Sequence, residues 1–404
     1  MHAALWMLTL AGAKQLRLGG ADVLYGDKGA QLQSLAHDRW AALQVAARIS
    51  LLPQPVVESQ NVTMVRAAEA RRVRLWSRFS ATYPFSDYWF WGRWPVPTVD
   101  RLPGFLARFD WHVGVMTNYL VNDDPQTVLV NVSMVGHFAD YVHAKIPATR
   151  SDRVLFIMQS RDMLVSKGLG SNKRERDARL RHLQARFAMI WATTQDDAST
   201  EDVIRVFPWG LAERYFYFAD GQFSAEQASS AIAAARLESK LPRVLASWGK
   251  LTTDTDFRES EETTGRAAAS ESRKEARSWS TSVEAQRIGV DFKSVSIKDW
   301  WSVLSKYRFV LSPLGIGIQS PKMIEALLVL TVPILQRGPW PTFDALLRLG
   351  FPIVVVEHWE EISAAKLRAW WQELSPRLEG FRATCLTADG YWRLLTGQTV
   401  RCGY

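Results

Sequence analysis

The segment that most constrains the fold joins an apolar run, a glycine loop and a helix. The run Tyr307–Leu311 is short and rich in aromatic and branched side chains, which is typical of a strand buried on both faces in a parallel sheet. Gly315 and Gly317 follow and allow the backbone to turn sharply. Ser320 suits a helix N-cap and Pro321 suits the first helical position. We therefore expect a helix that begins at Pro321.

The start of this helix predicts a binding place for phosphate or pyrophosphate. Backbone N–H groups at a helix N-terminus lack partners within the helix, and the helix dipole is positive there. Lys322 adds a full positive charge, and Glu325 follows three residues later on the same face. Its carboxylate can accept hydrogen bonds from the two hydroxyls of a ribose. The alternative is that Lys322 and Glu325 form a surface ion pair on an ordinary helix.

Strand-like and helix-like segments alternate along the chain, and this alternation predicts parallel, doubly wound α/β sheets. Strand-like runs occur at residues 127–132, 154–158, 187–192 and 203–207. A helix-like segment then ends before Pro242, and a new strand begins at Arg243. The chain has 404 residues, which is enough for two domains, and we expect them to span residues 1–241 and 242–404.

The first strand of the second domain leads to a further candidate residue. This strand spans residues 243–248, and Gly249 and Lys250 follow it. Open parallel sheets bind ligands outside the carboxyl ends of their strands, so Lys250 is placed to reach the phosphates of a ligand. A solvated loop lysine would give the same pattern.

The segment from Ser320 onward resembles the C-terminal half of exostosin-like glycosyltransferases. In that family a strand and a glycine loop lead into a Ser-x-Arg-x-x-Glu-Ala-Leu helix and a Val-Pro-Ile strand. The matching residues here are Ser320-Pro321-Lys322-Met323-Ile324-Glu325-Ala326-Leu327 and Val332-Pro333-Ile334. The similarity continues through residues 341–346 and 353–363. The family arginine is Lys322 here, which keeps the charge but loses the two-pronged hydrogen-bonding geometry.

The resemblance implies two Rossmann-like doubly wound domains that face a cleft, the GT-B arrangement. It also implies that Glu325 holds the ribose of a nucleotide-sugar donor, and that the helix at residues 388–395 crosses back to the first domain. The residues expected to bind the donor are Lys250, Gly315, Gly317, Ser320, Lys322 and Glu325.

A catalytic base is nominated from the first domain. Residues 82–95 place aromatic side chains between prolines, which fits a loop that lines a cleft. Exostosin-like proteins carry Gly-x-Asp-His-Phe at a comparable place. Asp87 matches the aspartate, whereas Tyr88 replaces the histidine and the glycine is absent. We therefore expect Asp87 to deprotonate the acceptor hydroxyl, with Asp140 and His137 as the next candidates.

The resulting expectation is an enzyme that transfers a sugar from a nucleotide diphosphate donor, in the first instance a UDP-sugar, to a glycan or glycoprotein. No metal ion or separate cofactor is expected, because His137, Asp140 and His143 lack the spacing of metal-ligand motifs. The resemblance implies a place in the secretory pathway, in the Golgi or the ER lumen.

Two other functions are alternatives to this one. A dinucleotide-dependent oxidoreductase also places glycines between a strand and a helix, but Ser320 replaces its third glycine. The strand after the helix ends in Gln336 instead of the acid that binds the ribose, which disfavours this class. A glycosyltransferase-like protein that binds a glycan or a partner without catalysis stays open, because the aspartate–histidine motif and the family arginine are both changed.

Composition limits the remaining possibilities. Lysine and arginine number 49 against 41 aspartates and glutamates, which gives a net charge of +8. This excess is not concentrated enough along the chain to indicate nucleic-acid binding. No apolar run reaches the roughly 18 residues of a membrane span, and Met1–Ala13 is only a marginal signal peptide, so we expect no membrane anchor within these residues. Cys385 and Cys402 either form a disulfide in an oxidising compartment or remain two thiols.

Overall fold

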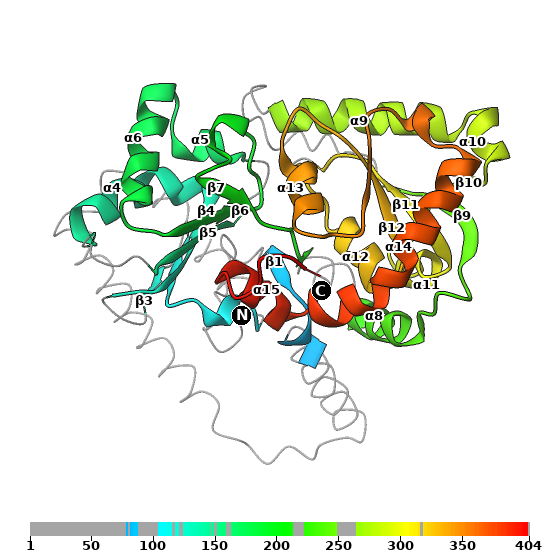
Figure 1. Cartoon of the computed structure of the whole chain (residues 1–404), viewed down its shortest axis with the longest axis horizontal. Helices are drawn as coiled ribbons and strands as arrows, with labels where there is room; N and C mark the ends of the chain where they lie inside the picture. The colour runs from blue at the N-terminus through cyan, green and yellow to red at the C-terminus, as the bar shows by residue number, and fades with distance from the viewer. Residues whose placement is uncertain are drawn as a thin grey trace, which may run out of the picture. The chain divides into compact units, whose positions relative to one another are not determined.

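The protein is an α/β structure with two mainly parallel sheets flanked by helices (Figure 1). The computed structural model describes residues 78–79, 81–87, 104–114, 118–120, 124–146, 148, 152–158, 163–212, 222–248, 264–315 and 318–402. Its internal contacts divide the chain into residues 1–68 and residues 69–404, and every described residue belongs to the second unit. The predicted domain boundary at residue 241 stays a prediction, although the second sheet does begin at Leu241.

The first sheet has six strands in the order β3-β2-β4-β5-β6-β7, of which only β3 is antiparallel to its neighbour. Its strands are β2 (Trp111–Val113), β3 (Asn118–Leu120), β4 (Thr127–Asn131), β5 (Val154–Met158), β6 (Met189–Ala192) and β7 (Ile204–Val206). Its helices are α4 (Val135–Lys145), α5 (Val165–Leu169) and α6 (Lys173–Gln184). The short 3-10 helix η5 (Leu106–Arg108) precedes β2, and η6 (Val132–Met134) and η7 (Ala198–Thr200) lie between later elements of this sheet. The strand β1 (Phe85–Asp87) pairs separately with β8 (Leu211–Ala212). All four predicted strands are confirmed to within two residues at each end.

The second sheet has five parallel strands in the order β10-β9-β11-β12-β13. These strands are β9 (Leu241–Ala246), β10 (Val290–Phe292), β11 (Tyr307–Ser312), β12 (Val332–Gln336) and β13 (Val354–Val356). The helices are α8 (Gln222–Ala234), α9 (Thr264–Ser280), α10 (Val283–Arg287), α11 (Trp300–Leu304), α12 (Lys322–Leu328), α13 (Thr342–Arg348), α14 (Ala364–Thr384) and α15 (Ala388–Leu395), with the 3-10 helix η8 (Trp359–Glu361) before α14. The described helices include none that is long and apolar enough to cross a membrane.

The organising segment folds as its sequence predicts, with a shift of one residue. The strand β11 is buried at all but one of its positions, and the Gly315 turn and α12 follow it. Pro321 is the N-cap instead of the first helical residue, and the hydroxyl of Ser320 accepts a 3.4 Å hydrogen bond from the backbone N–H of Lys322. The helix therefore begins one residue later than expected, and Ser320, which lies one residue before the N-cap, helps to cap it.

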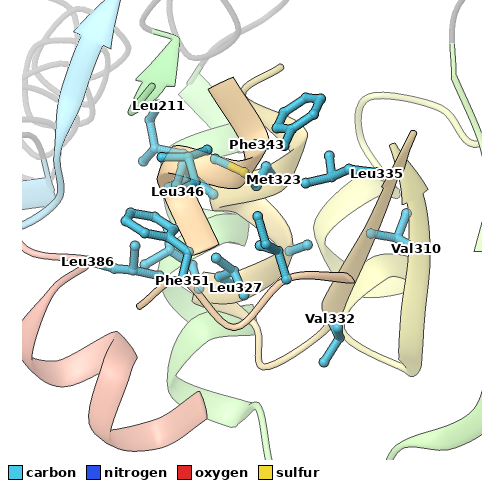
Figure 2. Packing of buried hydrophobic residues seen from close by; sticks show 14 of the residues in the cluster. Leu211, Val310, Met323, Leu327, Val332, Leu335, Phe343, Leu346, Phe351 and Leu386 are labelled. Carbon is cyan, nitrogen blue, oxygen red and sulfur yellow. The ribbon is translucent and has the colours of Figure 1, made fainter. Parts of the chain in front are cut away.

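The core of the second sheet surrounds α12. Six of the seven α12 residues are buried, and Met323 and Leu327 pack beside Phe343, Leu346 and the strands β11 and β12 (Figure 2). A buried side chain of this size contributes roughly 1.5–3 kcal/mol to folding. A helix that is apolar on nearly every side belongs in a core. The polar residues of α12 are consequently held in fixed positions against the sheet.

We predict that acid destabilises the protein through His112 on β2. The side chain is 0% exposed, and burial lowers its pKa from 6.5 to about 4. The unfolded chain takes up this proton near pH 6.5 and the folded chain only near pH 4, so the free energy of unfolding falls by up to about 3 kcal/mol as the pH drops through this interval. Urea unfolding at several pH values should show a shallower pH dependence for His112→Gln than for the wild type.

The exposed His137 supplies the matched control for this measurement. The variant His137→Gln should keep the wild-type slope of stability against pH. An unchanged slope in His112→Gln would show that another group controls acid unfolding.

Candidate functional site

A cluster of four polar or aromatic residues lies at the carboxyl ends of β9 and β11. The ammonium group of Lys322 donates a 2.9 Å hydrogen bond to the backbone carbonyl of Ser247 and lies 5.0 Å from the centre of the Trp300 ring. The indole N–H of Trp300 donates a 2.7 Å hydrogen bond to Oε2 of Glu325. We call Ser247, Trp300, Lys322 and Glu325 the Lys322 cluster. It joins the end of β9, the start of α11 and the first turn of α12.

The turn after β11 aims α12 at this cluster. Gly315 and Ile318 exchange two backbone hydrogen bonds of 3.1 and 3.0 Å. A Cβ atom at Gly315 would collide with the carbonyl group of Gln319, and Ile318 adopts a φ of 71°. Glycine is therefore required at position 315 because another part of the backbone comes so close. The described contacts give Gly315 a structural role in the turn, and Gly317 lies outside the described residues.

Burial shifts the protonation of both charged groups in the cluster. Glu325 is 5% exposed; burial raises the pKa of its carboxyl, and the hydrogen bond from Trp300 and the charge of Lys322 oppose that shift. Burial also lowers the pKa of Lys322 to about 8, against the effect of Glu325, while Arg273 on α9 lowers it further. The interpretation of Lys322 and Glu325 as a surface ion pair is therefore wrong, because the carboxylate lies under Trp300 and away from solvent.

The carboxyl ends of β11 and β12 are tied to α9 beside the cluster. The hydroxyl of Ser272 donates to Oε1 of Gln336 over 2.7 Å and accepts from the backbone N–H of Leu314 over 3.1 Å. The amide of Gln336 donates in turn to Oε2 of Glu275 over 2.7 Å. Gln336 thus has specific partners in α9. From the sequence alone, it was notable only as the residue that replaces the ribose-binding acid of an oxidoreductase.

Gln319 forms the clearest link between the two sheets. Its side-chain oxygen accepts a 2.8 Å hydrogen bond from the backbone N–H of Trp209. Its amide donates to the carbonyls of Thr193 and Phe207 over 2.8 and 2.9 Å. Thr193 directly follows β6 and Phe207 directly follows β7, so one side chain engages two strand ends of the first sheet. We call these contacts the Gln319 bridge.

The helix α15 also contacts the first sheet, as the resemblance implies. The phenol of Tyr391 donates a 3.0 Å hydrogen bond to the carbonyl of Trp209. The indole N–H of Trp191 on β6 donates a 2.9 Å hydrogen bond to the carbonyl of Leu395. Both contacts are buried, so α15 belongs to the packing of the first sheet as well as the second.

The described contacts place none of the candidate bases in the Lys322 cluster. Asp87 is the last residue of β1, and its side chain lies outside the described part of the structure, as does Lys250 altogether. Asp140 on α4 accepts from Arg179 on α6 over 2.8 Å, which gives it a role in joining these helices. His137 is exposed on α4. Within the described residues, no group of three or more His, Cys, Asp or Glu side chains is arranged to hold a metal ion.

Sequence reasoning missed two residues of this region, Trp300 and Gln319. Trp300 lies 25 residues before its partner Glu325, and the Gln319 contacts span 110 to 126 residues. One signal was available for Glu325, because apolar residues stand on both sides of it in the sequence. That pattern indicates a buried helix.

Comparisons with known proteins add no family assignment. No protein-family model matches the chain, and no curated protein matches it. The case for a function therefore depends on the strand order, the Lys322 cluster and the resemblance described above.

The Gln319 bridge leads to a stability prediction. The variant Gln319→Ala leaves three backbone groups, at Thr193, Phe207 and Trp209, without their side-chain partner in a buried place. We expect the free energy of unfolding to fall by about 2–4 kcal/mol, measured by urea unfolding, because each unsatisfied group has a cost. The exposed Gln372→Ala on α14 is the control and should change stability little. Equal stability of the two variants would contradict a bridging role.

Proposed function

We propose that this chain is a glycosyltransferase of the GT-B type, similar to the exostosin-like family. It binds a nucleotide diphosphate sugar, in the first instance a UDP-sugar, at the carboxyl ends of β9 and β11. It then transfers the sugar to a hydroxyl group of a glycan or glycoprotein.

The position of the Lys322 cluster in the second sheet is the observation that carries this proposal. The chain passes from β9 to β10 on one side, and then crosses to β11 on the other side of β9. The strand order therefore reverses between β9 and β11, and open α/β sheets bind ligands in the crevice at such a point. Lys322 and Ser247 connect the carboxyl ends of these two strands. A cation and a carboxylate thus meet where the fold favours a ligand.

The two charged groups suit the two ends of a donor's ribose diphosphate. Sugar transfer breaks the bond between the anomeric carbon and the diphosphate oxygen, forms a bond to the acceptor oxygen and releases the acceptor proton to a base. Lys322 would neutralise the charge that develops on the departing diphosphate. Glu325 would accept hydrogen bonds from the ribose hydroxyls. Asp87 remains the proposed base on the strength of its match to the family motif.

The cluster is closed in the structure, so donor binding must rearrange it. Glu325 is 5% exposed and already accepts from Trp300, so a ribose must displace or share that indole N–H. Lys322 must likewise turn from the carbonyl of Ser247 toward the phosphates. The same closure favours the alternative of a glycosyltransferase-like protein without catalysis, and ligand binding separates the two.

We predict that UDP stabilises the protein through Lys322 and Glu325. UDP at one hundred times its dissociation constant should add about 2.7 kcal/mol to the free energy of unfolding, which a thermal-shift assay detects readily. The variants Lys322→Met and Glu325→Gln should weaken binding by about 1.5–3 kcal/mol each, because each removes a charged hydrogen-bonding partner. Isothermal titration gives affinities that do not depend on the variants' own stability.

Matched controls are Lys366→Met and Glu373→Gln, which change exposed residues of α14 and should bind UDP as the wild type does. Parallel measurements with GDP and NAD distinguish the nucleotide class. A shift with NAD alone would favour the oxidoreductase. An affinity for UDP or GDP that is unchanged in both cluster variants, or the absence of any binding, would contradict the proposed donor site. Binding without release of UDP from any sugar donor would favour the non-catalytic alternative.

The pKa of Lys322 predicts how UDP binding depends on pH. Burial lowers this pKa to about 8 in the free protein, so the ammonium loses its charge as the pH rises above that value. The affinity for UDP should therefore fall up to tenfold per pH unit above about pH 8. Titrations of the wild type and Lys322→Arg across this range provide the test, since arginine keeps its charge. A similar pH profile in both proteins would contradict the role of Lys322.

A further inference from the structure

The structure brings together the side chains of Cys385 and Cys402, the chain's two cysteines. Cys385 directly follows α14, and Cys402 lies beyond α15. The two thiol groups are hydrogen-bonded to each other, and they are 3% and 2% exposed. The buried phenol of Tyr391 interacts electrostatically with both. The sequence left their pairing open, whereas the fold places them in contact.

The position of Cys402 is fixed by its backbone. Its N–H donates a 2.8 Å hydrogen bond to the carbonyl of Leu349. The next residue along, Gly350, has a φ of +90°, and a side chain there would collide with the carbonyl group of Cys402. The backbone around Cys402 is thus packed directly onto the turn after α13. Such packing keeps its thiol close to Cys385.

The loop between the two cysteines contains the helix that contacts the first sheet. Tyr391 and Leu395 of α15 make the buried hydrogen bonds to Trp209 and Trp191. Asp389, at the start of α15, also forms an ion pair with Arg108. A covalent link at the base of this loop would hold α15 next to the end of α14. The link would therefore act on the element that joins the two sheets.

We propose that Cys385 and Cys402 form a disulfide bond that closes the loop carrying α15. The sulfur–sulfur bond forms as the two thiols together lose two protons and two electrons. The oxidant is a disulfide, either oxidised glutathione or a protein dithiol–disulfide oxidoreductase, which is reduced to two thiols through a mixed-disulfide intermediate. The link restricts the unfolded chain and thereby favours the folded state.

Burial determines when this bond can form. The hydrogen bond that the Cys402 thiol donates to the sulfur of Cys385, together with burial, raises the pKa of Cys402, which disfavours the reactive thiolate in the folded protein. Exchange should therefore take place during folding, before α15 docks and covers both sulfur atoms. The folded, reduced protein should oxidise slowly, and the folded, oxidised protein should resist reduction.

The test is to refold the full chain in a mixture of reduced and oxidised glutathione, and separately in excess reductant. After unfolding, free thiols are alkylated and the intact mass is measured. The glutathione-refolded protein should carry no alkyl group and be lighter by two hydrogen atoms than the reduced protein. A peptide containing both cysteines should appear only without reductant. Two alkylated cysteines, or a link between two chains, would overturn the proposal.

Thermal unfolding supplies the second readout. The oxidised wild type should melt at a higher temperature than the reduced wild type, and its α15 region should be cleaved more slowly by protease. The variants Cys385→Ser and Cys402→Ser should show no dependence of melting on redox conditions. Equal melting of the oxidised and reduced wild type would overturn the stabilising role. None of these measurements involves a nucleotide, so their outcome is independent of the proposed donor site.

Discussion

The tight turn after β11 is the constraint on which both the site and the junction of the two sheets depend. Gly315 lets the backbone of Gln319 come closer than any side chain would permit, and the two hydrogen bonds with Ile318 fix that geometry. The turn sends the side chain of Gln319 into the strand ends of the first sheet, and three residues later it presents Lys322 to the end of β9. A ligand that moves Lys322 therefore acts on a segment that also holds the sheets together.

The buried Lys240 and the half-buried Lys322 of the second sheet show how a structural site differs from a candidate binding site. The ammonium of Lys240 donates to the carbonyls of Ser305 and Val329 and to the hydroxyl of Thr331, so three oxygen acceptors match its three N–H donors. The ammonium of Lys322 donates to one carbonyl among the described residues and otherwise faces the Trp300 ring. Lys240 thus completes the packing of α11 and α12, while Lys322 retains donors that an anionic ligand can use.

The sequence predicted the parts of the fold that local chemistry determines. The apolar run at Tyr307 became β11, and Ser320 and Pro321 set the start of α12 to within one residue, because capping and strand burial act over a few neighbours. The same patterns could not reveal Trp300 above Glu325 or the partners of Gln319, since those contacts join residues 25 to 126 positions apart. The resemblance directed attention to α12 as the helix of the candidate site, and tertiary packing decided that its glutamate is buried.

For the proposed donor site, the closed cluster favours a diphosphate over a nucleoside as the ligand. A ribose that displaces the indole of Trp300 exchanges one charge-assisted hydrogen bond to Glu325 for at most two of similar strength, about 1.5–3 kcal/mol each. The loss of packing when Trp300 moves offsets part of this gain. A diphosphate changes the balance, because it replaces the weak dipole of the Ser247 carbonyl with full negative charges beside a poorly solvated ammonium. In the proposed donor site, both residues would therefore contribute to the affinity, with Lys322 and the phosphates contributing more than Glu325 and the ribose.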